Sequence, residues 1–144
     1  MNALHSYLSF YSWKRVGDEE KPNEKLPYLV SLLYICKSMR IIKSGTLQNY
    51  CREPRYSGAQ KALQAWIYEV KYSDWNSSAE LKLKYKNASI ISSKRVVFNI
   101  KGNEYRLIVD VEYKMRIVFI VWFGTHSEYD KIDAKEVSYE SKGN

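Results

Sequence analysis

Cysteine and histidine, the residues that build disulfides and most transition-metal sites, are scarce in this sequence. There are only two of each among its 144 residues. Cys36 and Cys51 are too few for a disulfide framework, and neither lies in a CxxC pair or beside a histidine. A disulfide-stabilised secreted fold and a cysteine–histidine metal site are therefore not indicated. We expect a protein of the reducing cytoplasm that uses no metal or other cofactor.

The sequence also lacks a hydrophobic segment long enough to cross a membrane. Its longest apolar run, residues 26–36, falls well short of the roughly 20 residues that a membrane-spanning helix needs. Residues 1–25 are mixed and polar, whereas a secretory signal has a basic start followed at once by an apolar stretch. We therefore expect neither a membrane protein nor an exported one.

Acidic residues are also fewer than basic ones. The chain has 16 Asp and Glu against 23 Lys and Arg, which gives a formal net charge of +7 and a pI near 9.3. This balance favours a polyanionic partner, and nucleic acid is the natural candidate. The alternative is a basic, solvated surface with no specific partner. The hydrophobic content of 45% and aromatic content of 15% are enough to bury the core of one domain.

The first 38 residues differ in character from the rest of the chain. Most of the positive charge lies after them. Residues 17–27 form a polar stretch with prolines, which indicates a linker. The apolar run at residues 26–36 is typical of a short helix or strand. We recognise no catalytic or binding motif in the first 38 residues.

Helical patterns dominate the middle of the chain. A short strand at residues 40–43 is followed by a turn at residues 44–46, which we expect to cap a short helix over residues 47–52. Apolar residues recur at helical spacing between residues 60 and 71, which predicts a core helix. Ser77 and Glu80 have the spacing of a capping box, so a second helix should begin directly after Ser77.

This second helix should expose a strongly basic face. Its outward residues include Lys82, Lys84 and Lys86, whereas Leu81 and Tyr85 fall on its apolar face. The three lysines are candidate contacts for a polyanion. The alternative is that they only keep the helix surface in solution.

The last third of the chain changes to the period of β-strands. Residues 94–100 are apolar and β-branched, residues 101–104 are typical of a tight turn, and residues 105–113 alternate between apolar and polar, which predicts a β-hairpin. The continuous apolar run at residues 117–123 predicts a strand covered on both faces. We therefore predict an α+β fold with helices packed on one face of a mainly antiparallel sheet. We expect the polar tail from residue 131 to be frayed.

Three stretches stand out as motifs: residues 39–42 (MRII), 95–107 (RVVFNIKGNEYRL) and 124–131 (GTHSEYDK). Together they resemble the HigB toxins of bacterial toxin–antitoxin operons, which belong to the RelE/ParE fold. The resemblance assigns residues 39–133 to a small toxin domain. It leaves residues 1–38 as an extension outside the family pattern, or as an upstream translation start, and residues 134–144 as a polar tail.

The resemblance implies a function as well as a fold. HigB-type toxins imply an mRNA endonuclease that works on the ribosome and is neutralised by a cognate HigA-type antitoxin. The antitoxin usually binds operator DNA, so we expect this chain to reach operator DNA only through it. Cleavage is expected to proceed by attack of the ribose 2′-OH on the adjacent phosphate, which requires no metal.

His126 leads the candidate catalytic residues, because it directly follows the last predicted strand. Tyr129 and Asp130 come three and four residues later, so a helical turn would return both to the same side. We predict that His126 acts as general acid or base, that Asp130 orients its imidazole and that Tyr129 stacks on a base. The alternatives are a histidine that only fixes the turn, an aspartate that caps it and a tyrosine in the core.

Basic side chains of the predicted hairpin complete the candidate site. Arg106 alternates away from the apolar face of its strand, where it can clamp a phosphate or, alternatively, pair with Asp110 or Glu112. The remaining candidates are expected to position RNA phosphates and not to take part in the chemistry. They are Lys94, Arg95, Lys101, Lys82, Lys84 and Lys86.

The sequence departs from the family pattern at one position of the last strand. Many relatives carry an arginine there, in an Ile-Arg-Phe sequence before the Gly-Thr-His motif, whereas this chain has Val121 followed by Trp122. If that arginine stabilises the transition state, its loss costs ~100-fold or more in rate. Two alternatives to an active nuclease therefore stay open: a homologue that binds the antitoxin with weakened catalysis, and a gyrase-targeting toxin of the ParE kind.

Overall fold

The computed structural model describes Val30 and residues 38–139 of the chain. The chain divides into two units, residues 1–32 and 33–144, and every described residue except Val30 belongs to the second. The linker expected at residues 17–27 lies outside the described residues, as does the element expected at residues 26–36 apart from Val30. No helix in the described part is both long and apolar enough to cross a membrane.

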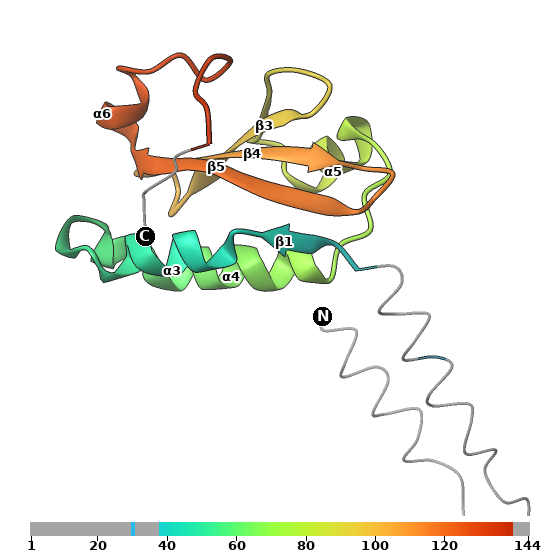
Figure 1. The fold of residues 1–144 in the computed structure, drawn as a ribbon, viewed down its shortest axis with the longest axis horizontal. Coiled ribbons are helices and arrows are strands. Elements are labelled where there is room, and N and C mark those ends of the chain that lie inside the picture. The colour runs from blue at the N-terminus through green and yellow to red at the C-terminus, as the bar shows by residue number, and fades with distance from the viewer. Residues whose placement is uncertain (1–29, 31–37, 140–144) are drawn as a thin grey trace, which may run out of the picture. The chain divides into compact units, whose positions relative to one another are not determined.

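Figure 1 shows the described helices and strands of the second unit. In chain order they are β1 (Arg40–Ile42), α3 (Ser44–Arg52), the 3-10 helix η1 (Pro54–Ala59), α4 (Gln60–Lys71), α5 (Ser78–Lys84), β2 (Ser89–Ile90), β3 (Arg95–Ile100), β4 (Tyr105–Glu112), β5 (Ile117–Thr125) and α6 (His126–Tyr129). The strands and the core helix predicted from the sequence are therefore confirmed.

The described strands form one five-stranded sheet in the order β1-β5-β4-β3-β2. Neighbouring strands from β2 to β5 run antiparallel, whereas β1 pairs with β5 in parallel. β3 and β4 make the expected hairpin, with Ile100 opposite Tyr105 at the turn. The predicted α+β fold with a mainly antiparallel sheet is therefore confirmed.

The start of α3 differs from the expectation. Residues 44–46 were expected to form a turn, but Ser44 is already the first residue of the helix. The reason is Lys43, whose left-handed backbone (φ 62°) turns the chain from β1 directly into α3. The N–H of Thr46 donates to the Lys43 carbonyl at 3.0 Å, which closes this turn within the helix start.

The capping box expected at α5 forms only in part. Ser77 Oγ accepts the backbone N–H of Glu80 at 3.2 Å, as predicted. The Glu80 carboxylate, however, accepts the backbone N–H of Asn76 at 2.9 Å. The helix still starts at Ser78, because the serine cap alone satisfies one of its free N–H groups.

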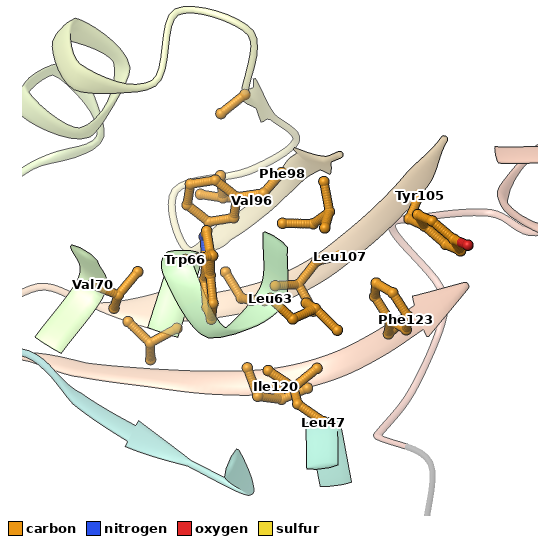
Figure 2. Close-up of a cluster of buried hydrophobic side chains, with 14 of the residues drawn as sticks. Leu47, Leu63, Trp66, Val70, Val96, Phe98, Tyr105, Leu107, Ile120 and Phe123 are labelled. Atoms are coloured by element: carbon orange, nitrogen blue, oxygen red, sulfur yellow. The ribbon is translucent and has the colours of Figure 1, made fainter. Parts of the chain in front are cut away.

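An aromatic core lies between the helices and one face of the sheet, which we call the helical face. Phe98 of β3 is fully buried there, and its ring centroid lies 5.3 Å from that of Trp66 on α4. Figure 2 shows Leu63 and Trp66 of α4 on the same side of the sheet as Leu107 and Phe98. Each large apolar side chain buried in this way stabilises the fold by roughly 1.5–3 kcal/mol.

A smaller apolar cluster covers the other side of the sheet, which we call the opposite face. Its buried members are Val97, Ile108, Val121, Trp122 and Ala134. Val121 and Trp122 are adjacent in sequence yet both belong to it, because a register shift in the β4–β5 pairing interrupts the alternation of side chains. Ile132 and Val137, from the chain that follows α6, pack against the cluster.

This C-terminal chain is anchored as far as Tyr139, so the expectation that it is frayed from residue 131 onward is wrong for its described part. Arg95 of β3 donates to the carbonyl oxygens of residues 134, 135 and 137 at 2.8–3.1 Å. The same guanidinium makes two hydrogen bonds to Asp110, at 2.8 and 2.9 Å, and the Tyr139 hydroxyl donates to Asp110 at 2.8 Å. Contacts with distant residues of the sheet, and not a repeated pattern of its own, therefore hold this tail.

Candidate active site

The Gly-Thr-His motif lies where β5 ends and α6, a helix of a single turn, begins. Thr125 is the N-cap of α6: its Oγ accepts the Glu128 N–H at 3.2 Å, and the Glu128 carboxylate accepts the Thr125 N–H at 2.7 Å. The backbone N–H of His126 donates to the Glu104 carbonyl at 2.9 Å. These bonds fix the His126 backbone beside the β3–β4 turn.

His126 and Asp130 meet across this turn, as their spacing predicts. The Nδ1 atom of His126 lies 3.2 Å from the Oδ2 atom of Asp130, which is an ion-pair distance without the alignment of a hydrogen bond. Nδ1 is shut off from solvent, although the His126 side chain as a whole is 40% exposed. Nδ1 therefore cannot meet a substrate, which leaves Nε2 as the candidate ring nitrogen.

Arg106 is a buried cation on β4, directed to the opposite face as the alternation of the strand predicts. The residue is only 8% exposed. Its guanidinium donates to the side-chain oxygen of Asn103 at 2.7 Å, and to the carbonyls of Asn103 and Tyr105 at 3.2 and 3.3 Å. The turn between β3 and β4 thus holds Arg106 in one position.

The ion pair that the sequence left open for Arg106 does not form. Asp110 binds Arg95 at 2.8 Å, and Glu112 binds Lys94 at 3.0 Å. Among the residues that the structure describes, Arg106 makes no ion pair, and neutral oxygens alone receive its hydrogen bonds. A phosphate group is the kind of anion that such a guanidinium binds well.

Tyr129 connects Arg106 to the turn that carries His126. The guanidinium carbon of Arg106 lies 5.8 Å from the centre of the Tyr129 ring, within the range of a cation–π contact. The centroid of the same ring is 6.3 Å from that of Trp122 in the opposite-face cluster. All four predicted catalytic residues therefore lie at one end of the opposite face, and Tyr129 is neither fully buried nor fully free.

Glu128 was not among the predicted residues, yet it joins α6 to η1. Besides Thr125, its carboxylate accepts the Tyr56 hydroxyl at 3.1 Å and Nη1 of Arg55 at 3.2 Å. Burial raises the pKa of Glu128, but the hydrogen bonds from Thr125 and Tyr56 and the charge of Arg55 outweigh it, so the pKa lies below its ordinary value. The Thr-x-x-Glu spacing of a capping box is the signal that could have identified this residue.

Gly124 leaves room for the side chains around it. A Cβ atom at this position would lie 2.5 Å from the Trp122 ring and 2.9 Å from the Glu128 carboxylate. Neither neighbour can easily move, because Trp122 belongs to the opposite-face cluster and Glu128 caps α6. The close approach of these two side chains thus explains why the motif has a glycine at this position.

The predicted phosphate contacts on the hairpin differ in what they can still bind. Lys101 lies on the turn and pairs with Glu104, whose carbonyl holds His126. Lys94 makes the exposed pair with Glu112 described above. The hydrogen bonds of Arg95 to Asp110 and to the C-terminal carbonyls favour a structural role for it over an RNA contact.

The lysines Lys82 and Lys84 of α5, and Lys86, which follows the end of the helix at Lys84, are not brought to the His126 turn. Figure 1 shows α5 and α6 at opposite ends of β4 and β5. Lys82 donates to the Ala88 carbonyl and Lys84 to the Ser73 hydroxyl, while Lys86 is exposed. These side chains can meet only RNA that extends well beyond the candidate site.

The position at which the resemblance described above leads us to expect an arginine is apolar and covered. Val121 is 3% exposed and belongs to the cluster that the C-terminal chain closes. Arg106 is therefore the buried guanidinium that the structure places beside α6. Among the described residues, no three His, Cys, Asp or Glu side chains are grouped so that they could hold a metal ion.

A protein-family model matches this chain, whereas a search of curated proteins finds no match. The model of the HigB_toxin family, whose members are described as the RelE-like toxic component of a toxin–antitoxin system, matches residues 59–132, slightly more than half of the chain. The matched range includes Arg106, His126, Tyr129 and Asp130, and membership implies an antitoxin partner. This chain belongs to the HigB toxin family.

Proposed function

We propose that this chain is the toxin of its pair and cuts mRNA on the ribosome, with His126 at the centre of the cleavage site. The observation that carries the proposal is the His126–Asp130 pair at 3.2 Å, on a capped turn beside the buried guanidinium of Arg106. A group that transfers protons and a cation for the phosphate are what RNA cleavage needs when no metal takes part.

The proposed reaction transfers a phosphate within the RNA chain. The ribose 2′-oxygen attacks the adjacent phosphorus while the bond from phosphorus to the 5′-oxygen breaks, so the products are a 2′,3′-cyclic phosphate and a 5′-hydroxyl end. One proton leaves the 2′-hydroxyl and one reaches the 5′-oxygen, and Nε2 of His126 carries one of these transfers. Asp130 stabilises the imidazolium, and Arg106 neutralises the charge that grows on the phosphoryl oxygens.

Other residues at the same end of the sheet are proposed to hold the RNA. Tyr129 offers part of its ring for stacking on a base, since it is only half-buried. Lys101 and Lys94 bind phosphates, and Lys82, Lys84 and Lys86 meet RNA farther from the cut. A HigA-type antitoxin would neutralise this toxin and provide the only link to operator DNA.

Mapping transcript ends in cells tests the proposal. The full chain, His126→Ala and Ser127→Ala are induced separately, and the 5′ ends of cellular transcripts are sequenced. Ser127 is exposed and lies next to His126, so its variant is the matched control. We expect new ends inside translated regions with the wild type and with Ser127→Ala, and a fall of about 100-fold or more with His126→Ala.

The outcomes separate the candidate functions. An unchanged transcript map for all three proteins would overturn the proposal. Intact transcripts together with DNA-damage signalling would indicate a gyrase target instead. Circular dichroism of purified His126→Ala, with the same spectrum and melting temperature as the wild type, excludes unfolding as the cause of lost cleavage.

A second candidate function is an antitoxin-binding homologue with weakened catalysis, and the burial of Val121 favours it. The side chain at this position is enclosed by apolar neighbours and supplies no charge for a phosphate. Calorimetry with the antitoxin, run beside cleavage assays on translating ribosomes, distinguishes the two. Tight binding without cleavage by the wild type would establish the second candidate.

A further inference from the structure

The turn that carries His126 has little to hold it in place by itself. α6 contains four residues, and none of them is buried. A helix of this length is not stable alone in water, because forming its first turn costs more than one hydrogen bond returns. Its position must therefore depend on the side chains that tie it to the rest of the fold.

One carboxylate supplies several of these ties. Oε2 of Glu128 accepts the Thr125 N–H at 2.7 Å, the Thr125 hydroxyl at 3.0 Å and the Tyr56 hydroxyl at 3.1 Å. Oε1 accepts Nη1 of Arg55 at 3.2 Å. The carboxylate thus bonds at once to Thr125, which ends β5 and caps α6, and to two residues of η1. Charged acceptors of this kind make stronger hydrogen bonds than neutral ones.

The tie reaches the rigid part of the molecule through Tyr56. This residue is 3% exposed, and its ring centroid lies 5.4 Å from that of Phe123 and 5.6 Å from that of Tyr50, so aromatic neighbours fix its hydroxyl. From this fixed hydroxyl, hydrogen bonds lead to Glu128 and then to Thr125, whose peptide bond joins it to His126. The aromatic core of the helical face thereby sets the place of an imidazole at the far end of β5.

We propose that Glu128 is the positioning residue of the site: through it, the aromatic core holds His126 in the position from which it transfers a proton. This inference rests on the proposed function. Glu128 does not touch the RNA in this role. It acts on the chemistry only through the turn that carries His126 and Asp130. A displacement of a catalytic group by about 1 Å is costly, because it takes the reacting atoms out of their productive arrangement and can lower the rate ~100-fold.

Amide hydrogen exchange, measured by NMR on the full chain, tests the positioning without any cleavage assay. The reporters are the amides of His126, bonded to the Glu104 carbonyl, and Asp130, bonded to the His126 carbonyl. We expect both to exchange roughly tenfold faster in Glu128→Ala, since a lost cap opens the turn more often. Glu128→Gln, which keeps an acceptor for Thr125 but not the charge, should fall between the two.

Two controls separate positioning from general loss of structure. The Val111 amide, bonded to the Lys94 carbonyl in the sheet, should exchange at the wild-type rate in every variant. Glu136→Ala removes an exposed carboxylate from the C-terminal chain and should change neither reporter. If Glu128→Ala does not fold, Tyr56→Phe deletes only the hydroxyl and should accelerate the same two amides by a smaller factor.

Cleavage by the same variants completes the test. We expect kcat to fall about tenfold in Glu128→Ala with KM nearly unchanged, because the residue does not contact the substrate. Wild-type exchange at both reporters would overturn the inference, and so would faster exchange with full cleavage. A wild type that cuts no RNA would refute the proposed function, whereas the exchange rates would still show whether Glu128 holds the turn.

Discussion

The two faces of the sheet are held by different forces. On the helical face, large rings such as Phe98, Trp66 and Phe123 meet at centroid distances between 5 and 7 Å and lie out of water. On the opposite face the apolar cluster is small, and charged groups, Arg95 and Glu128 among them, tie the C-terminal chain and α6 to the sheet. The face that carries the candidate chemistry is therefore stabilised by a few specific bonds, and the other by buried area.

On the helical face, Phe98→Ala should cause the largest loss of stability. The side chain is fully buried and contacts Trp66, Trp75 and Tyr85, so its removal leaves a cavity that these rings cannot fill. We expect the free energy of unfolding to fall by about 3–5 kcal/mol, measured by urea titration. A loss below about 1 kcal/mol would mean that the rings repack and that this face is not the rigid one.

On the opposite face, Arg95→Ala should cause the largest loss. It leaves Asp110 without its partner and frees the carbonyls of the C-terminal chain, so we expect a loss of about 2–3 kcal/mol. Limited proteolysis should then cut after residue 131 in the variant but not in the wild type. Lys94→Ala is the matched control, since its exposed pair with Glu112 contributes at most about 1 kcal/mol.

Acid should weaken the opposite face before the helical one. Burial raises the pKa of Asp110, but the hydrogen bonds from Arg95 and Tyr139 and the charge of Arg95 outweigh it and lower the pKa below its ordinary 3.8; the pKa of Glu128 is likewise below 4.5. Groups of this kind stabilise the fold fully above their unfolded pKa, and the stabilisation is lost as the pH falls through the lower folded value.

The unfolding free energy should therefore decline as the pH falls below about 4.5, with the smallest amplitude of the three effects. Urea titrations between pH 7 and pH 3 measure this decline. Asp110→Asn should flatten it, because an amide does not titrate. If the unfolding free energy of the wild type and of the variant depended on pH with the same slope, protonation of Asp110 would not be the cause of the decline.

The elements with a periodic sequence pattern could be predicted from the sequence alone. Helical spacing between residues 60 and 71 gave α4, and the alternation around a tight turn gave the β3–β4 hairpin. The meeting of His126 and Asp130 followed from the geometry of one helical turn. Their roles in catalysis were suggested by family resemblance, since spacing shows which residues meet and not what they do.

Contacts between residues that lie far apart in the sequence could not be predicted. Glu128 reaches Tyr56 across 72 positions of the sequence, and Arg95 reaches the carbonyls of the C-terminal chain across 39 to 42 positions. No local pattern marks such contacts. The start of α3 was misplaced for a different reason, because a lysine with left-handed backbone has no signature comparable to that of glycine.

The order of translation adds a consequence of the Arg95 anchor. A nascent chain contains Arg95 well before it contains the carbonyls of residues 134–137 that bind it. A prematurely terminated product that ends before residue 134 would include every strand of the sheet and every helix of the helical face, but not the cover over Val121. The opposite face is thus completed by some of the last described residues to leave the ribosome that makes the protein.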